Sequence, residues 1–469
     1  MPATLFDKIW DAHTVRRLGD GSSLIYVDRL FLHERTGGVA LTSLGDDGRE
    51  LRRPRHVFAT MDHIVDTFPG RGDRTLVPGG EEFIRTMRRA ARATGVRLFD
   101  IDDPAHGISH LIAAEQAIAQ PGFVVACPDS HTCTLGALGA IGWGIGSSDC
   151  EHALATETLR GSKPAQMRVR FGGRLPDGVT AKDMILHLIG RYSASGGAGH
   201  AIEFCGEAID RLPLEARFTL CNMAVEFSAF TGIIAPDEQV IGYLDGRRYA
   251  PADADRERAI AHWRSLRSDD DAVFDREIDV DAADVAPTIT WGISPQHAVP
   301  VTGSVPHLDE AADDEERAQM ELAMDYMGLR PGQRLEGLPI DAAFIGSCTN
   351  ARLSDLREAA RILDGRRIAD GMRAICTPGS AEVKRNAEAA GIARIFKEAG
   401  FEWREPGCSL CFHAGGEGFG VGERVMTSTN RNFRGRQGRG VRSHLASPAA
   451  VAAAAVAGRI VDVREVSRS

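Results

Sequence analysis

Short apolar runs that end in small or polar residues recur along this chain, and a helical pattern follows several of them. The run "GFVVAC" leads into "PDSHT", "AAFIG" leads into "SCTN", and "MRAIC" leads into "TPGSAEVKRNAEAAG". In the last stretch Ser380 is a suitable N-cap for a helix, and Gly391 is a suitable residue to end it. This alternation of strands with helices predicts an α/β fold.

Polar residues stand at the ends of these three predicted strands. In open α/β sheets, ligands bind in the crevice beyond the carboxyl ends of the strands. The loops that carry "PDSHT", "SCTN" and "TPGS" are therefore candidates for a single site.

Neither the first residues nor the most apolar run predicts export or a membrane span. "MPATLFDKIWDAH" brings in charged residues at once, so we expect mature sequence and not a signal peptide. "PAAVAAAAVAG", with Ser447 as N-cap and Gly458 at the exit, predicts a buried helix. It is far shorter than the roughly 20 residues that a membrane helix needs. We therefore expect a cytoplasmic protein whose nine cysteines are reduced thiols.

Length and charge set the domain number and exclude some classes of protein. At roughly 150 residues per domain, 469 residues suggest about three domains, which we place at 1–165, 166–290 and 291–469. The acidic stretches Asp269–Pro287 and "HLDEAADDEERAQ" are expected to be surface connections. The net charge of −10 disfavours a general nucleic-acid or membrane binder, so any anion site must be local. No G-x-G-x-x-G or G-x-x-x-x-G-K-[ST] motif supports nucleotide binding.

"GCSLC" places Cys408 and Cys411 three positions apart. Such a pair can be a redox dithiol, half of a zinc site, part of an iron–sulfur site, or two packed thiols. A zinc ribbon needs a second C-x-x-C, which the chain lacks, and the glycines around the pair disfavour the thioredoxin-type junction. Cys348, at the end of an apolar run in "FIGSCTN", can add a third thiol. Three cysteines on a 4Fe–4S cluster leave one iron open for Lewis-acid catalysis.

Histidines beside carboxylates are candidates for proton transfer. They occur as Asp62-His63, His110 and Asp129-Ser130-His131. An imidazolium beside a carboxylate can protonate a leaving hydroxyl, whereas the alternative is a buried, hydrogen-bonded histidine without a catalytic role.

Two further motifs carry candidate ligands for an anionic substrate. "NRNFRGRQGRG" contains Asn430, Arg431 and Arg436, and the guanidinium fork suits a carboxylate, although a solvated basic loop is the alternative. In "CNMAVE", Asn222 and Glu226 are four residues apart, so on a helix they would reach the same point of the site.

Six of these motifs, in this order along the chain, resemble the aconitase superfamily. They are "ATMDH", "PDSHT", "LCNMAVE", "FIGSCTN", "PGCSLC" and "TSTNRNFRGRQG". The resemblance implies an aconitase-like α/β fold of three domains around a central iron–sulfur cleft, with one 4Fe–4S cluster on Cys348, Cys408 and Cys411. It implies catalytic roles for Asp62, His63, His110, Asp129, Ser130, His131 and Glu226. It implies substrate or cluster contacts for Asn222, Asn430, Arg431 and Arg436.

The match is strongest to the branch of the superfamily that isomerises 2-isopropylmalate to 3-isopropylmalate through 2-isopropylmaleate, in leucine biosynthesis. Single-chain aconitases add a C-terminal swivel domain that holds the serine base, and no segment after the alanine-rich helix matches it. The resemblance therefore implies that a separate small subunit completes the site.

Some features depart from that branch and keep other functions open. Pro128 stands where a small residue is usual, and "CFHAGGEGFG" with His413 replaces the usual sequence beside the cluster cysteines. A relative acting on another 2-substituted malate, such as citramalate or methylmalate, is the alternative. An RNA-binding apo-protein and a structural zinc protein are more remote, because neither explains the histidine and arginine motifs together.

Overall fold

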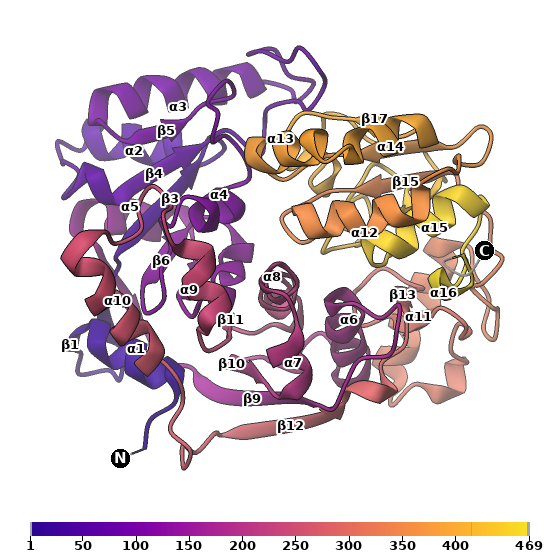
Figure 1. Ribbon diagram of the computed structural model, residues 1–469, viewed down its shortest axis with the longest axis horizontal. Coiled ribbons are helices and arrows are strands. Elements are labelled where there is room, and N and C mark those ends of the chain that lie inside the picture. The colour runs from indigo at the N-terminus through magenta and orange to yellow at the C-terminus, as the bar shows by residue number, and fades with distance from the viewer. Residues whose placement is uncertain (1, 414, 467–469) are drawn as a thin grey trace.

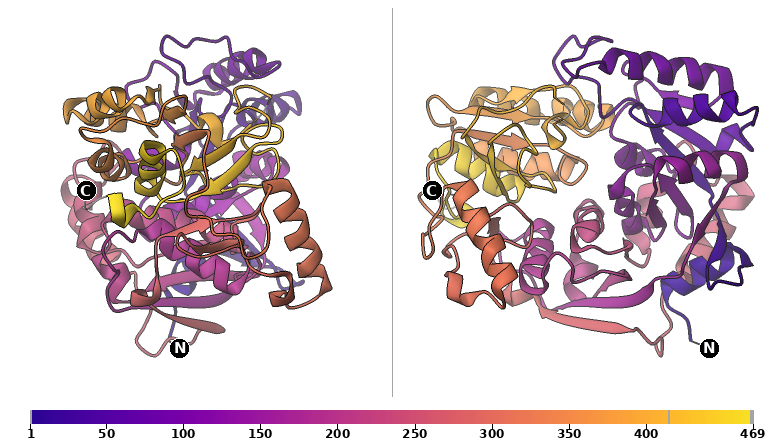
Figure 2. Two further views of the ribbon diagram at one scale, coloured as in Figure 1. Left: turned by 90° about the vertical axis from the view of Figure 1, so that its right-hand side faces the viewer. Right: turned by 180° about the vertical axis from the view of Figure 1, so that it is seen from behind.

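Three α/β units, each built on one parallel sheet, make up the molecule in a computed structural model that describes residues 2–413 and 415–466 (Figure 1). The first unit, in indigo and purple, stands beside the third, in orange and yellow, and the second, in magenta, lies beneath both. The view from behind shows the same arrangement (Figure 2). None of the helices in the described ranges is both long and apolar enough to span a membrane.

The first unit has a five-stranded sheet of order β5-β4-β3-β6-β7. Its strands are β3 (Arg29–His33), β4 (Val57–Thr60), β5 (Arg97–Phe99), β6 (Val124–Cys127) and β7 (Ile141–Gly144). All residues of β4 and β6 are buried, as expected for parallel strands covered on both faces. The helices of this part of the chain are α1 (Leu5–His13), α2 (Gly37–Asp46), α3 (Gly80–Thr94), α4 (Ser109–Glu115) and α5 (Ser147–Thr156). A small antiparallel sheet is formed by β1 (Thr14–Arg17), β2 (Ser23–Tyr26) and β8 (Thr158–Gly161).

The second unit has a four-stranded parallel sheet of order β11-β10-β9-β12. Its strands are β9 (Ala165–Gly172), β10 (His200–Cys205), β11 (Thr231–Ile233) and β12 (Arg276–Asp281). Its helices are α6 (Ala181–Tyr192), α7 (Glu207–Arg211), α8 (Leu214–Asn222), α9 (Glu238–Leu244) and α10 (Asp253–Ser265). The hairpin of β13 (Thr288–Thr290) and β14 (Ala298–Pro300) and helix α11 (Asp314–Met327) lead to the third unit.

The third unit has a five-stranded parallel sheet of order β17-β16-β15-β18-β19. Its strands are β15 (Ala342–Ile345), β16 (Arg373–Cys376), β17 (Glu402–Trp403), β18 (Arg424–Thr427) and β19 (Arg442–Leu445). Its helices are α12 (Leu353–Leu363), α13 (Ala381–Ala389), α14 (Ile392–Ala399), α15 (Pro448–Ala457) and α16 (Val463–Val466).

The three parallel sheets share one strand order. In each, the first strand is central, the next two lie to one side, and the fourth crosses to the other side. The order therefore reverses between β3 and β6 in the first unit and between β15 and β18 in the third. Such switch points open crevices at the carboxyl ends of strands, and both switch points carry site motifs. The sequence shows no internal repeat from which this shared strand order could have been predicted.

The structure confirms the α/β fold and several predicted helix ends. Ser447 caps α15 and Gly458 ends it in a left-handed conformation, while Ser380 caps α13. The expected connections were partly wrong: Asp269–Pro287 contains β12, and "HLDEAADDEERAQ" contains the start of α11. In β12 only alternate residues are buried and the others are charged, so the stretch resembled a solvated loop. The exact domain limits stay predictions.

Candidate active site

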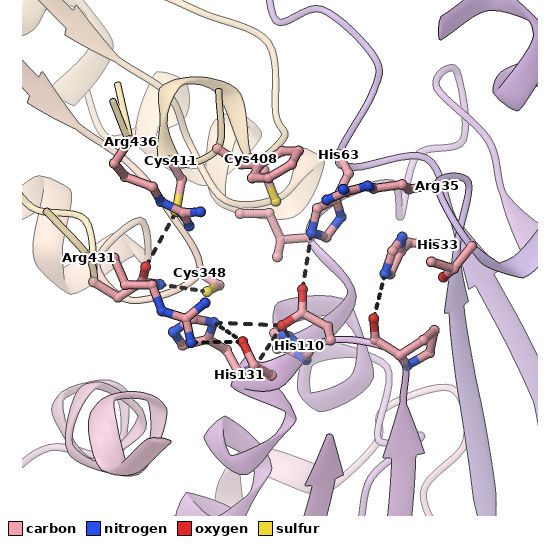
Figure 3. Close-up of a pocket in the computed structure, with 17 residues that line it drawn as sticks. His33, Arg35, His63, His110, His131, Cys348, Cys408, Cys411, Arg431 and Arg436 are labelled. Atoms are coloured by element: carbon pink, nitrogen blue, oxygen red, sulfur yellow. Dashed lines mark hydrogen bonds and ion pairs between the residues drawn. The ribbon is translucent and has the colours of Figure 1, made fainter. Parts of the chain in front are cut away.

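A cavity of about 270 Å³ lies where loops of the first and third units meet (Figure 3). Segments that follow β3, β4, β5 and β6 form one wall, and loops that follow β15, β17 and β18 form the other. Eleven of the fourteen residues predicted for the site line this cavity. The other three, Asp62, Asn222 and Glu226, are buried or nearly so and contact residues of the wall.

Three thiols occupy the wall of the third unit. Cys348 follows β15, while Cys408 and Cys411 flank a 3₁₀ turn after β17. All three are buried, with at most 6% of each side chain exposed. Ser347 and Ser409, beside these thiols, have positive φ angles of 86° and 49°. Non-glycine residues rarely adopt this conformation, so the backbone is strained where it presents the thiols.

Polar groups point at these sulfur atoms. Asn222 Nδ2 lies 3.2 Å and Asn430 Nδ2 lies 3.5 Å from Cys348 Sγ, and Arg436 Nη2 lies 3.6 Å from Cys411 Sγ. Burial raises the pKa of the Cys408 thiol well above its usual range, so an uncompensated thiolate is unfavourable there. A metal centre would supply that compensation. Three buried thiols with donors around them, and no fourth cysteine on the cavity wall, fit an iron–sulfur cluster with one open iron.

The opposite wall carries a chain of histidines and carboxylates. His63 is held at both nitrogens, since Nδ1 lies 2.6 Å from Asp62 Oδ1 and Nε2 lies 3.0 Å from Asp129 Oδ2. Burial alone would lower the pKa of His63, but these two carboxylates outweigh it and raise that pKa well above its usual value. Burial alone would raise the pKa of Asp129, yet its histidine partners hold it well below the usual range. His63 is therefore a fixed cation between two anions.

Asp129 also faces the other two predicted histidines. Its Oδ1 lies 3.1 Å from His110 Nε2 and 3.7 Å from His131 Nδ1. His110 Nε2 is buried and makes no hydrogen bond of good geometry within the described ranges. His110 Nε2 therefore faces Asp129 without the aligned hydrogen bond that His63 makes to Asp62 and His131 makes to Glu226.

Glu226, from the second unit, contacts one residue of each wall. Its Oε1 lies 2.9 Å from His131 Nε2 and 2.7 Å from Arg431 Nε. Burial alone would raise the pKa of Glu226, but His131 and Arg431 lower it below its usual value, so the carboxylate stays ionised. Arg431 also donates to Ser130 Oγ at 3.1 Å. Arg431 and His131 are thereby fixed as one unit at the cavity.

The expectation that Asn222 and Glu226 reach the same point was wrong. Helix α8 ends at Asn222 and a 3₁₀ turn, Met223–Phe227, follows it, so the four-residue spacing does not place the two side chains on one face. Asn222 contacts Cys348, and its Oδ1 accepts from Thr349 Oγ1 at 2.7 Å. This position favours a role in orienting the thiol loop over direct contact with substrate.

The arginine loop after β18 provides positive charge at the cavity. Arg436 is 8% exposed, and its guanidinium lies over the rings of Phe412 and Phe433. Its Nε is a buried donor that has no hydrogen-bond partner in the described parts of the chain. Buried unpaired donors are costly, so this geometry favours an anionic ligand in the cavity.

Sequence reasoning missed several residues of the cavity wall. His33 stacks on the His63 ring at 4.2 Å, and burial together with the His63 charge lowers the pKa of His33 to about 4. Arg35 lies over the Phe412 ring at 4.4 Å. The signal was present, because "LFLHERT" is an apolar run followed by polar residues, like the loops that were recognised.

The two unusual positions differ in their placement. Pro128 lines the cavity, and its carbonyl lies 3.0 Å from His33 Nε2. His413 does not line the cavity, and its Nδ1 instead lies 3.2 Å from the Glu417 carbonyl. The side chain that "CFHAGGEGFG" brings to this wall, besides Cys411, is Phe412. Ala414 of this stretch is outside the described residues.

The chain is similar to several known proteins. A family model described as "Aconitase family (aconitate hydratase)" matches residues 7–458. The chain is 50% identical to 3-isopropylmalate dehydratase large subunit 1 of Bradyrhizobium diazoefficiens over 99% of this chain and 97% of that protein. It is 47% identical to the protein of the same name from Mannheimia succiniciproducens, over 99% and 98%. Among solved structures, aconitase X of Thermococcus kodakaraensis in its holo-form is similar, with 13% identity, a TM-score of 0.47 and coverage of 91% and 89%.

Proposed function

The chain belongs to the aconitase family, and on that premise we propose that it is the large subunit of a 3-isopropylmalate dehydratase. This hydro-lyase would interconvert 2-isopropylmalate and 3-isopropylmalate through 2-isopropylmaleate, in leucine biosynthesis. The observation that carries the proposal is the meeting of three buried thiols, a histidine–carboxylate chain and two arginines at one cavity. The names of relatives that match along nearly the whole chain support the substrate.

The thiol wall would hold the cofactor. We assign a single 4Fe–4S cluster to Cys348, Cys408 and Cys411, because these are the only cysteines among the residues that line the cavity. When bound, such a cluster supplies a Lewis-acidic iron to the substrate hydroxyl and carboxylate. Asn222 and Asn430 would hold the Cys348 sulfur in place through their amide groups.

The arginines would bind and orient the diacid. Arg431 and Arg436 lie on the same wall as the thiols and carry guanidinium groups suited to carboxylates. Glu226 fixes the orientation of Arg431 before substrate arrives, so less orientation entropy is lost on binding.

Proton transfer to the leaving hydroxyl would fall to His110 or His131. His63 is unsuited to it because both of its nitrogens are held by carboxylates. His110 Nε2 faces Asp129 at 3.1 Å without a well-aligned hydrogen bond, and His131 is oriented by Glu226. Either can give a proton to the departing water and take it back in the reverse step. The base that removes the proton alpha to a carboxylate would come from the small subunit.

A small-subunit partner is proposed because both relatives are named large subunits. A cytoplasmic location is proposed because none of the nine cysteines, all of them described, forms a disulfide, as is usual in a reducing compartment.

The proposal is tested by reconstituting the chain anaerobically with iron and sulfide and adding the small subunit of the Bradyrhizobium enzyme. We expect 2-isopropylmalate to give an ultraviolet-absorbing alkene diacid and then 3-isopropylmalate. Turnover of citramalate or methylmalate without turnover of isopropylmalate would favour the alternative substrate class. Bound zinc in place of iron and sulfide, or selective RNA binding by the apo-protein, would contradict the enzyme assignment.

A further inference from the structure

Lys182 is a fully buried cation that the mechanism above does not use. It is the second residue of α6 in the second unit, and 1% of it is exposed. Its Nζ reaches into the third unit, where it donates to the carbonyls of Ser428 at 3.1 Å and Thr429 at 2.5 Å. Those two residues follow β18 and directly precede Asn430 and Arg431.

This placement is electrostatically unfavourable for the isolated chain. Lys182 Nζ makes hydrogen bonds to two carbonyls, and within the described ranges it forms no ion pair with a carboxylate. The N-terminal turn of a helix carries partial positive charge, which adds repulsion to the cost of burial. The neighbouring Asp183 spends its oxygens on the Thr180 and Thr288 backbones, and burial raises the pKa of Asp183 to about 6. Burial lowers the pKa of Lys182 itself to about 7.

One step further along the same loop, a hydrogen bond leads to the thiol site. Asn430, next to the Thr429 carbonyl that Lys182 holds, donates to Cys348 Sγ at 3.5 Å. Besides the carboxylates of Asp355 and Glu226, the sulfurs of Cys411 and Cys348 act electrostatically on Lys182. As thiolates, these groups and a cluster on them would place anionic charge near the ammonium. The path from Lys182 through Thr429 and Asn430 to Cys348 is short and entirely buried.

We infer that Lys182 is a positioning residue that couples the second unit to the thiol site and supplies the counter-charge for its loaded, anionic state. It fixes the Ser428–Thr429 backbone so that Asn430 and Arg431 face the cavity. It also adds a buried positive charge to that of Arg436, whose Nη2 lies 3.6 Å from Cys411 Sγ, in the field of the three thiolates. The inference rests on the proposed function, because it assumes that the three cysteines hold a cluster.

The test compares Lys182→Met and Lys182→Gln with Lys397→Met, which removes the same charge from an exposed site on α14. Melting temperature is measured for the empty and the cluster-loaded protein, together with the rate of iron release and the cluster reduction potential. We expect both Lys182 variants to lose more stability loaded than empty, to release iron at least about tenfold faster, and to show a lower potential. Lys397→Met should match wild type in all three.

Two results would overturn this inference and leave the proposed function intact. They are an equal loss of melting temperature in the empty and loaded forms, or an unchanged rate of iron release and an unchanged reduction potential. The first would mark Lys182 as an ordinary structural donor to two carbonyls. Gln keeps a donor for those carbonyls without the charge, so it separates packing from electrostatics if Lys182→Met folds poorly. Wild-type protein that binds no cluster would overturn the proposed function, and this inference with it.

Discussion

Asp129 is contacted by all three of the predicted site histidines. One carboxylate facing three imidazoles stays ionised, since its pKa is held well below the usual range. The histidines are therefore not equivalent. His63 is locked as a cation by a second carboxylate, Asp62, while His131 has Glu226 as its own partner. We therefore expect the same residue type to hold a fixed charge at one position and to transfer a proton at another.

His131→Ala should lower turnover by roughly 2 to 4 orders of magnitude, if His131 takes part in proton transfer. The free energy of unfolding should fall by about 1 to 3 kcal/mol, because buried Glu226 loses one partner but keeps Arg431 as the other. Steady-state kinetics and thermal melts of loaded protein with the small subunit measure both quantities. His152→Ala, on the exposed face of α5, is the matched control. A variant that melts much lower but keeps its specific activity would show that His131 is structural.

Serine at Cys348, Cys408 or Cys411 should each prevent stable cluster assembly, because a hydroxyl is a poor replacement for a thiolate ligand. Cys376→Ser is the control, since Cys376 is equally buried at the end of β16 but does not line the cavity. Iron and sulfide content after anaerobic reconstitution measures the effect. Undiminished content in all three variants would remove the basis for the assigned ligand set. Exposure of wild type to oxygen should release one iron and leave an inactive 3Fe–4S form.

At the scale of elements, a seam between the first and third units sets the distance between the two walls. Gly107 and Ser380 form an isolated bridge, and the Ile108 N–H donates to the Gly379 carbonyl at 2.9 Å. A Cβ on Gly107 would lie 2.6 Å from the Ser380 Cβ, so only glycine permits this approach. The loop that carries Cys408 is also fixed to the first unit, because the backbone N–H of Cys408 donates to the Asp62 carbonyl at 2.9 Å. The cysteine loop is therefore held in a fixed position relative to the histidine wall.

Glu115, at the end of α4, makes this seam sensitive to pH. Its Oε1 accepts from Ser380 Oγ at 2.7 Å, and burial raises the pKa of Glu115 to about 7 from an ordinary 4.5. Because the pKa of Glu115 is higher in the folded than in the unfolded protein, its contribution to stability is fully present below about pH 4.5. That contribution is lost as the pH rises through about 7. Between pH 5 and pH 8, wild type should therefore lose roughly 2 kcal/mol relative to Glu115→Gln.

Denaturant titrations of both proteins at the two pH values measure that difference. Glu81→Gln is the control, since Glu81 is a partly exposed residue in the first turn of α3. Parallel pH profiles for wild type and Glu115→Gln would show that Glu115 is already ionised in the folded protein at pH 5, contrary to this prediction.

The elements that sequence reasoning found and missed differ in a physical way. Strand ends carrying "PDSHT" and "SCTN" were predicted because fully buried parallel strands give continuous apolar runs. Strand β12 was missed because its exposed face is charged. The switch from α-helix to 3₁₀ turn after Asn222 depends on tertiary contacts that no local pattern shows. Lys182 was missed because a lysine in the first turn of a helix usually points to solvent.

At the scale of the molecule, the site exists only where three units meet. The first unit supplies the histidines, the third supplies the thiols and arginines, and the second supports both from behind through Asn222, Glu226 and Lys182. Single motifs could be recognised in the sequence because they contain chemically distinctive residues. Their pairing across the cavity could not, since His131 and Glu226, for example, are 95 positions apart in the chain.

Exchange of the small subunit between an isopropylmalate enzyme and a citramalate enzyme should move the substrate preference of this chain with the small subunit. The charged groups at the cavity recognise what all 2-hydroxy diacids share, namely two carboxylates and a hydroxyl. We therefore expect the small subunit to make most of the contacts with the apolar substituent of the substrate. A hydrophobic pocket discriminates by only about 1 to 3 kcal/mol per methylene, so related acids should show measurable side activity. The ratio of kcat/KM for isopropylmalate and citramalate, measured for each pairing, tests this. A preference that stays with this chain would instead assign specificity to the apolar part of its own wall, Ile108, Pro128 and Phe412, and would favour a substrate outside leucine biosynthesis.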